Sequence, residues 1–360
     1  MFVKSKKRIT IKDVAKLSGM SYSTVSRVLN GFQGFPDSTR KIVWDAANEL
    51  NYTPNSQARN LRSGCETDNE KTGIIIHITH SGYDSPEGSE YEALRSLKLA
   101  WNAEKLGLYT ISYWYHERKG FQCPPVLNGH VDGAIVGTPH MEVVNILKDK
   151  IPVVLMDVPF SSKVTHVPAV NTNLQLGFSE LLQELISLGH KNIGTFYSPT
   201  TGDGASLERP VANALAFAAS MAGIASYNDL WIAEDISPET HDVVMKKVSL
   251  RFIELVRQRR ISAIILPNIV YAVGIYEHLT AAGLKIPEDV SIASLYSGFH
   301  SIPYGITAIK YNWDGLTRTS LEVLKKLIDK KAYPCTEFLV EPTLQYGNTI
   351  SKSILMIRAK

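Results

Sequence analysis

From Gly73 onward, short apolar segments alternate with longer segments of helical periodicity, and this alternation constrains the fold more than any other feature. Seven of the apolar segments have the length and composition of buried strands: 74–78, 109–113, 133–136, 153–155, 193–196, 263–266 and 291–293. Such alternation predicts βαβ units and parallel sheets rather than a sandwich or a helical bundle. The roughly 290 residues exceed the usual size of one doubly wound domain, so two sheet subdomains with a cleft between them are expected.

The first fifty residues have a different pattern, typical of a small helical domain. Three helices are predicted, each after a residue that can cap its first turn: 11–18 after Thr10, 22–29 after Ser21 and 38–50 after Asp37. Gly19 and Gly31 are expected to end the first two. Apolar residues recur at helical spacing on all three and predict one small core: Val14, Leu17, Val25, Val28, Leu29, Ile42, Val43, Ala46 and Leu50.

Charge is divided unevenly along the chain. Residues 1–64 contain eleven Lys/Arg and four acids, a net charge of +7, whereas the remainder carries −4. A local excess of positive charge indicates a polyanionic partner for that part of the chain.

Composition excludes several classes of protein. With 44% hydrophobic residues the chain can bury a core, which rules out full disorder. The three cysteines match no zinc or disulfide pattern, and a reducing cytoplasm is expected. No apolar run approaches the length of a membrane span, and no signal-peptide core follows the basic start, so neither secretion nor membrane contact is expected.

The first two predicted helices and the tight turn between them form a helix-turn-helix pattern. Its second helix carries Tyr22, Ser23 and Arg27 and is suited to a DNA major groove. Arg27 is expected to contact guanine, with Tyr22 and Ser23 sharing base recognition, while Ser21, Thr24 and Asn30 hold phosphates. The alternative is that these positions are merely the solvated face of a small helical domain, and the basic charge of the segment argues against it.

The same segment resembles the head of the lactose/galactose repressor (LacI/GalR) family of bacterial regulators. The resemblance covers the whole head and is carried by IKDVAKLSG at 11–19, STVSRVLNG at 23–31, NYTPN at 51–55 and ARNLR at 58–62. It implies a homodimer on a pseudo-palindromic operator, with a hinge helix within 55–63 that pairs in the central minor groove. The expected DNA-binding residues are Thr10, Ser21, Tyr22, Ser23, Thr24, Arg27, Asn30, Asn55, Ala58 and Leu61.

The resemblance places Leu61 at the position of a wedge that enters between base pairs. An inserted apolar side chain unstacks and kinks DNA, which lets more protein surface engage. Leu61→Ala is therefore expected to weaken specific binding more than non-specific binding. The alternative is that Leu61 is an ordinary linker residue buried against the core.

The core resembles the same family through VDGAI at 131–135, IPVVLMD at 151–157, LGHKNI at 188–193 and GLKIPEDVS at 283–291. This implies a periplasmic-binding-protein-like core of two doubly wound α/β subdomains, connected by three crossovers, with the effector between them. The expected domains are 1–54 for the helix-turn-helix head, 55–72 for hinge helix and linker, and 73–350 for the core. Within it, subdomain 1 is expected at about 73–169 plus 304–333, and subdomain 2 at about 170–303 plus 334–350.

Seven residues are expected to contact the effector. By resemblance Arg209 matches an anchoring arginine and Asn268 a polar cleft residue, although an arginine at a helix start is also a common surface residue. The acidic exit of the first strand carries two tyrosines, which either stack on a ring or belong to a solvated loop. The full set is His80, Tyr83, Asp157, Asn173, Arg209, Asn268 and Tyr296.

The core departs from sugar-responsive relatives at positions where those proteins often have acids. It carries Asn173, Ile269 and Tyr296 there, and no aspartate lies between 169 and 179. Neutral groups bind sugar hydroxyls less strongly than carboxylates do, so an effector other than a simple sugar is expected.

Three hypotheses for function follow. The first is a sequence-specific transcriptional regulator, expected to be a repressor and cytoplasmic (nucleoid-associated), whose operator affinity is switched by a small molecule. The second replaces the small molecule with a protein partner. The third is an enzyme on the same core, and the absence of GxGxxG, P-loop, GxSxG and HExxH motifs argues against it. No catalytic residue, metal or cofactor is expected, and His77, His80 and His190 are interpreted as structural.

Overall fold

The structure is a computed structural model in which contacts divide the chain into two compact units, residues 1–72 and 73–360. It describes residues 9–29, 32, 34–50, 52, 71–80, 89–115, 120–123, 126, 130–137, 140–158, 166–198, 208–224, 230–236, 240–296, 298, 302–330 and 336–354. Each unit is considered separately below.

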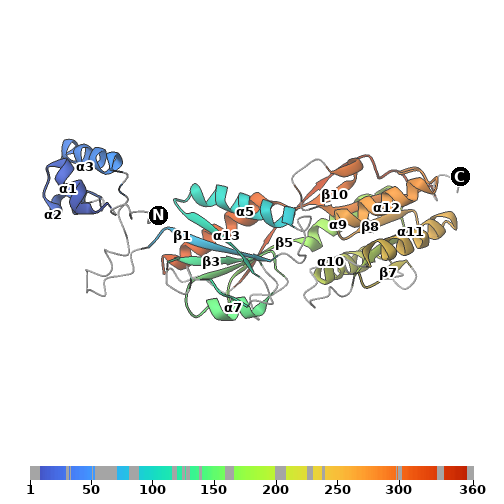
Figure 1. Ribbon diagram of the computed structural model, residues 1–360. Coiled ribbons are helices and arrows are strands. Elements are labelled where there is room, and N and C mark those ends of the chain that lie inside the picture. Colours follow the sequence, from blue (N-terminus) through green and yellow to red (C-terminus); the bar gives the residue numbers. More distant parts are fainter. Residues whose placement is uncertain are drawn as a thin grey trace, which may run out of the picture. The chain divides into compact units, whose positions relative to one another are not determined.

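The first unit contains three short helices: α1 (Ile11–Ser18), α2 (Tyr22–Leu29) and α3 (Asp37–Glu49) (Figure 1). Gly19 ends α1 in the left-handed conformation with φ 66°, which glycine adopts without strain. One cluster of side chains from all three helices forms the core, with Val14, Val25 and Val43 completely buried. The predicted three-helix head is therefore confirmed.

Three details of the head differ from expectation. Asp37 is the first residue of α3 and not its cap, because Pro36 occupies the N-cap position. Leu17 on α1 and Ile42 on α3 are each 45% exposed. The buried residue of α1 is Val14, and the buried stripe on α3 runs through Val43, Ala46 and Ala47. Gly31 lies outside the described residues.

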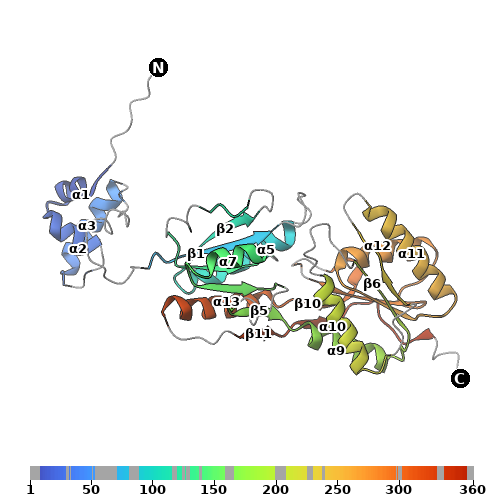
Figure 2. The same cartoon turned by 90° about the horizontal axis from the view of Figure 1, so that it is seen from below.

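The second unit contains two six-stranded sheets, and the first is entirely parallel in the order β11-β5-β4-β3-β1-β2. Helices cover both of its faces (Figures 1 and 2). Strands buried on both sides are typical of parallel sheets and explain the unbroken apolar runs in the sequence. The strands are β1 (Ile74–His80), β2 (Tyr109–Tyr115), β3 (Gly133–Val136), β4 (Val153–Met156), β5 (Ala169–Thr172) and β11 (Glu337–Val340). Helices α5 (Ser89–Glu104) and α13 (Trp313–Ile328) cover one face and α7 (Met141–Leu147) the other.

The second sheet has the order β12-β10-β9-β8-β6-β7 and is parallel except for β12, which pairs antiparallel with β10. Its strands are β6 (Ile193–Tyr197), β7 (Trp231–Ala233), β8 (Ala263–Leu266), β9 (Ser291–Tyr296), β10 (Thr307–Lys310) and β12 (Thr343–Gln345). Helices α9 (Leu174–Ser187) and α10 (Glu208–Met221) cover one face, and α11 (His241–Arg257) and α12 (Ile269–Ala281) the other. A 3-10 turn, η3 (Pro303–Gly305), precedes β10.

The chain passes between the two sheets three times: from β5 to α9, from β10 to α13 and from β11 to β12. The expected boundaries near 170, 304 and 334 therefore assign β5, β10 and β11 to the wrong subdomain. Residues 169–172 and 337–340 pair within the first sheet, and residues 307–310 pair within the second. These edge pairings depend on hydrogen bonds between strands far apart in sequence, which local pattern does not reveal.

Candidate functional site

The amino end of α2 is organised by a cluster of hydroxyl groups. The Ser21 Oγ accepts a hydrogen bond from the backbone N–H of Thr24 at 3.0 Å and so caps the helix, as predicted. The same oxygen lies 2.8 Å from the hydroxyls of both Ser23 and Thr24. These three side chains therefore hold the start of the helix, and their hydroxyls stand at its exposed end, where anions are favoured.

Two large side chains of α2 point away from the head core. Tyr22 is 39% exposed, and Arg27 is exposed with its guanidinium 5.7 Å from the ring centre of Phe32. No described acid forms an ion pair with Arg27. Its charge is thus available to an external partner, whereas the Val25, Val28 and Leu29 side chains of the same helix are buried.

The remaining expected DNA-binding residues are placed differently. Thr10 is exposed at the start of α1, where its backbone N–H and its hydroxyl both donate to the Asp13 carboxylate at 2.7 Å. Asn30, Asn55, Ala58 and Leu61 lie outside the described residues, so the hinge helix and the wedge remain predictions.

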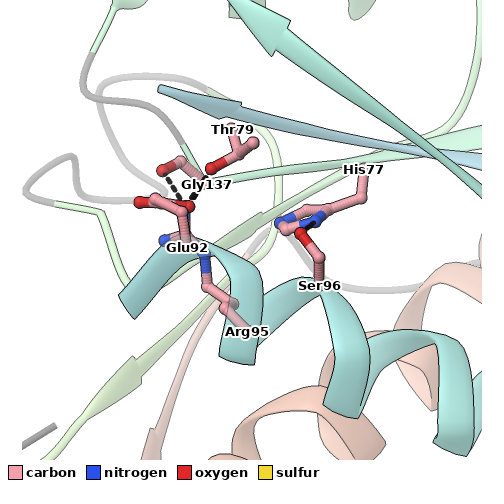
Figure 3. Close-up of polar contacts among 6 residues, drawn as sticks. All are labelled: His77, Thr79, Glu92, Arg95, Ser96 and Gly137. Atoms are coloured by element: carbon pink, nitrogen blue, oxygen red, sulfur yellow. Dashed lines mark hydrogen bonds and ion pairs between the residues drawn. The ribbon is translucent and has the colours of Figure 1, made fainter. Parts of the chain in front are cut away.

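In the core, an arginine and a glutamate are buried together where the first sheet ends. Arg95 is fully buried and Glu92 is 5% exposed; both belong to α5 (Figure 3). The Arg95 Nη2 donates to the Glu92 Oε2, to the Thr79 Oγ1 at 3.1 Å and to the Gly137 carbonyl oxygen at 2.6 Å, and the Thr79 hydroxyl also donates to the Glu92 Oε2. Because Thr79 lies near the end of β1 and Gly137 follows β3, this cluster stands at the carboxyl edge of the sheet, where α/β folds bind ligands.

The absence of a side chain at position 137 makes room for the guanidinium. A Cβ on Gly137 would lie only 2.5 Å from the Arg95 Cζ and Nη2 atoms. Any larger residue would have to displace the arginine from the Gly137 carbonyl oxygen, so glycine is required here for close approach to the backbone.

A second acid lies at the same edge. Asp157 follows β4 with φ 53°, and its Oδ1 accepts from the Thr172 hydroxyl at 3.1 Å. The pKa of Glu92 is raised to about 7, chiefly by burial; the Arg95 charge and hydrogen bond oppose this shift, and the Asp157 charge adds to it. Desolvation and the Asp157 charge also raise the pKa of Tyr311 well above its ordinary value. Two acids, one arginine and one tyrosine therefore interact electrostatically at this edge.

Three of the expected effector residues at the second sheet, Asn173, Asn268 and Tyr296, are uncharged, and the two asparagines are structural caps. The Asn173 and Asn268 side chains accept from the backbone N–H groups of Leu176 and Tyr271, at 3.1 and 2.9 Å, and so begin α9 and α12. Tyr296 is 5% exposed at the end of β9. Arg209 lies in the first turn of α10 and His80 ends β1, but their side chains, like Tyr83, lie outside the described residues.

Two buried histidines have structural partners. The His77 Nδ1 is 2.9 Å from the Ser96 hydroxyl, and burial holds the pKa of His77 well below its ordinary value (Figure 3). The His190 ring contacts the Ser262 hydroxyl and the Ser351 carbonyl oxygen at 2.9 and 2.8 Å, and burial lowers its pKa as well. Both rings are therefore neutral parts of the framework.

Sequence reasoning missed Glu92, Arg95 and Thr79. The sequence comparison considered residues that directly follow strands, whereas the Glu92 and Arg95 side chains come from the first turns of α5. The available signal was the spacing of Glu92 and Arg95, three residues apart at the start of a helix that follows the first strand. The expected effector set contains one acid of this edge, Asp157, but not Glu92, which stands at the same edge of the first sheet.

Comparison with known proteins agrees with this architecture. Residues 10–55 match the family described as bacterial regulatory proteins, lacI family, and residues 182–350 match the periplasmic binding protein-like domain. The HTH-type transcriptional repressor PurR of Klebsiella pneumoniae (strain 342) is 28% identical over 353 residues, which cover 93% of this chain and 95% of that protein. PurR of Edwardsiella ictaluri (strain 93-146) is 26% identical over 349 residues, with the same two coverages.

Solved structures agree in fold over nearly the whole chain. A Lac repressor dimer bound to operator and the anti-inducer ONPF superposes with a TM-score of 0.74 at 22% identity, covering 96% of this chain and 100% of that one. The complex of the transcriptional regulator CelR with cellobiose gives a TM-score of 0.56 at 21% identity, covering 95% and 100%.

A helix-turn-helix head joined to a two-sheet core of the periplasmic-binding type defines a bacterial transcription regulator. The chain belongs to the LacI/GalR family of transcriptional regulators. Among the described residues, no helix is both long and apolar enough to cross a membrane.

Proposed function

We propose that this protein is a sequence-specific DNA-binding repressor, active as a homodimer in the cytoplasm, whose operator affinity is controlled by a small molecule bound at the carboxyl edges of the core sheets. The observation that carries the proposal is the exposed α2 surface, where Tyr22 and Arg27 flank a capped helix start in a head of net positive charge. A core whose polar groups gather at the ends of parallel strands supports the second half. Catalysis forms no part of the proposal.

Selection from a random duplex pool tests DNA recognition. The full-length protein would be incubated with the pool at about 150 mM salt, which suppresses purely electrostatic binding, and the bound duplexes sequenced. Enrichment of a pseudo-palindrome with half-sites about one helical turn apart is expected. If neither the free protein nor the protein supplemented with metabolite extract enriches a sequence, the proposal is wrong.

Variants of α2 sharpen the test. Arg27→Ala removes an exposed side chain that makes no ion pair with a described acid, so the fold should be unaffected while specific affinity falls by roughly 10- to 100-fold, the value of a bidentate base contact. Lys41→Ala, at an exposed position on α3, is the matched control for loss of one positive charge. Equal effects of the two substitutions would mean that Arg27 acts only through its charge.

The surface of the first subdomain supports the homodimer. Leu97 and Trp101, one turn apart on α5, are 66% and 61% exposed, and the neighbouring strand β2 is the edge of its sheet. Exposed apolar groups beside a sheet edge are usually covered by a partner. Trp101→Glu is expected to shift the protein toward monomer in sedimentation velocity, with Lys98→Glu on the same helix as the control.

A protein partner that replaces the small molecule is the second candidate. Thermal-shift screening of the purified protein against metabolites separates the two, because a reproducible stabilising ligand of low micromolar affinity would rule out control by a protein partner alone.

A further inference from the structure

Phe32, which follows α2 in the chain, is exposed beside the DNA-binding helix. Its side chain is 61% exposed, whereas Phe35, three residues further on, packs against the core of the head. A single exposed apolar side chain is common at protein surfaces and needs no explanation by itself. Phe32 is distinguished by its neighbour, because the Arg27 guanidinium lies over its ring.

Two contacts join Phe32 to Arg27. The backbone N–H of Phe32 donates to the Arg27 carbonyl oxygen at 3.0 Å, which ties the chain after α2 back to the last turn of that helix. The centre of the Phe32 ring lies 5.7 Å from the Arg27 Cζ, within the range of a cation–π contact. Because the backbone bond fixes where the Phe32 side chain starts, local structure holds the ring beside the guanidinium.

A contact with an aromatic ring leaves the hydrogen-bonding capacity of the guanidinium intact. Arginine has five N–H donors in one plane, and a carboxylate in a bidentate ion pair occupies two of them. The ring attracts the positive charge through its quadrupole and accepts no conventional hydrogen bond. Phe32 can therefore orient Arg27 while two donors remain for O6 and N7 of a guanine.

The opposite end of the α2 surface is also ordered by contacts within the head. The hydroxyls of Ser23 and Thr24 each lie 2.8 Å from the Ser21 Oγ. Arg27 has a much longer side chain, and such a side chain loses rotamer entropy when binding to DNA fixes it. A contact that restricts Arg27 before DNA binds lowers this cost and strengthens the complex.

We infer that Phe32 is a positioning residue of the DNA-binding surface: its ring holds the Arg27 guanidinium in the orientation that reads a base, which raises operator affinity and base discrimination at that position of each half-site. The inference deepens the proposed function and rests on it. A cation–π contact at an exposed site is weaker than a bidentate base contact, so Phe32 contributes a smaller factor than Arg27, about two- to fivefold for each half-site.

A double-mutant cycle on the full-length protein tests the inference, with the duplex enriched by operator selection and a random duplex as probes. Phe32→Ala should weaken operator binding about two- to fivefold for each half-site and leave binding to the random duplex unchanged, because the Arg27 charge remains. In an Arg27→Ala background the same substitution should cause no further loss. Trp44→Ala removes another exposed aromatic side chain of the head and, as the matched control, should bind like the wild type.

Two further variants separate the aromatic ring from its bulk. Phe32→Leu keeps an apolar side chain without a π face and should behave like Phe32→Ala, whereas Phe32→Trp supplies the strongest cation–π partner and should bind at least as tightly as the wild type. Operator selection repeated with Phe32→Ala should relax the base preference at the same position as Arg27→Ala and at no other. A thermal melt of each variant checks that it folds.

Three results would overturn the inference. The first is a loss from Phe32→Ala that persists in the Arg27→Ala background, which would indicate a direct contact of Phe32 with DNA. The second is an equal loss on operator and random duplex, and the third is wild-type affinity in Phe32→Ala or Phe32→Leu. If the wild type enriches an operator, any of these results refutes only this inference, whereas failure to enrich an operator refutes the proposed function and the inference with it.

Discussion

The two sheets of the core have nearly the same strand order, yet they carry different chemistry at their carboxyl edges. At the first edge, Glu92 and Arg95 are buried against each other and Asp157 stands beside them. At the second edge, Asn268 caps a helix and Tyr296 closes the strand, so the described groups named there are neutral. One fold thus supports a buried ion pair at one edge and uncharged groups at Asn268 and Tyr296 at the other, where Glu234, directly after β7, pairs with Lys247 at the partly exposed surface. Ligand chemistry is therefore set by a few residues at strand and helix ends rather than by the sheet itself.

The largest expected effect is the loss of Arg95. Arg95→Met would leave Glu92 buried without its partner and should lower the free energy of unfolding by about 4 kcal/mol at neutral pH or above. Chemical denaturation at about pH 8 measures the change. Combining it with Glu92→Gln should recover much of the loss, and a double variant as unstable as the single one would show that Arg95 contributes through packing alone.

The charged edge should also make stability depend on pH. The folded protein raises the pKa of Glu92 from 4.5 to about 7, so the unfolded chain releases this proton at lower pH than the folded one. Stability from the neutral carboxyl is therefore present below about pH 4.5 and is lost as pH rises through 7, by on the order of 3 kcal/mol in total.

Comparison of wild type with Glu92→Gln isolates this contribution. The free-energy difference between the two proteins should change in favour of Glu92→Gln from about pH 5 to pH 8. A difference that stays constant across this range would mean that Glu92 titrates normally in the folded state.

A smaller effect is expected when the space beside Arg95 is filled. Gly137→Ala places a Cβ 2.5 Å from the guanidinium and should destabilise the core by about 2 kcal/mol, the usual cost of overpacking. Gly274→Ala on α12 is the control from the second subdomain, because its Cβ would meet only the Met245 Cε at 3.4 Å. Alanine at position 274 should leave the free energy of unfolding unchanged or raise it by up to about 1 kcal/mol. Similar losses of stability at positions 137 and 274 would contradict the close packing of Arg95 on Gly137.

The smallest change in stability is expected at the second edge, where Asn268 caps α12. Asn268→Ala removes the hydrogen bond to the Tyr271 N–H and should reduce the stability of the core by about 1 kcal/mol without any dependence on pH between 5 and 8. Thermal melting at three pH values would check both points. A loss that grows with pH would show that a titrating group acts on the Asn268 cap.

The sequence predicted the framework more completely than the site. Alternating apolar segments identified β1, β2, β3, β4, β6, β8 and β9, and the cap at Ser21 placed the start of α2 correctly. Short edge strands such as β7 and β11 were missed, since they are only three and four residues long and are partly exposed. The expected crossovers were displaced because β5, β10 and β11 were not recognised as strands.

Asn173 and Asn268 illustrate the limit for site residues. Their polar side chains at strand ends indicated ligand contacts, but the structure shows that both oxygens cap helices. Position after a strand is equally consistent with a cap and with a ligand contact, because both occur where a strand leads into a helix.

The sequence by itself determined the helix-turn-helix head, the two parallel sheets and the positive charge of the head, because helical spacing, apolar runs and charge are local properties of the chain. Only the tertiary structure decided that Glu92 and Arg95 meet Thr79 and Gly137 at one buried point, with Asp157 close enough to shift the pKa of Glu92. These residues span 79 to 157, and they come together through the order in which strands pair. That order is fixed by long-range hydrogen bonding and by burial of both sheet faces, which no local pattern in the sequence records.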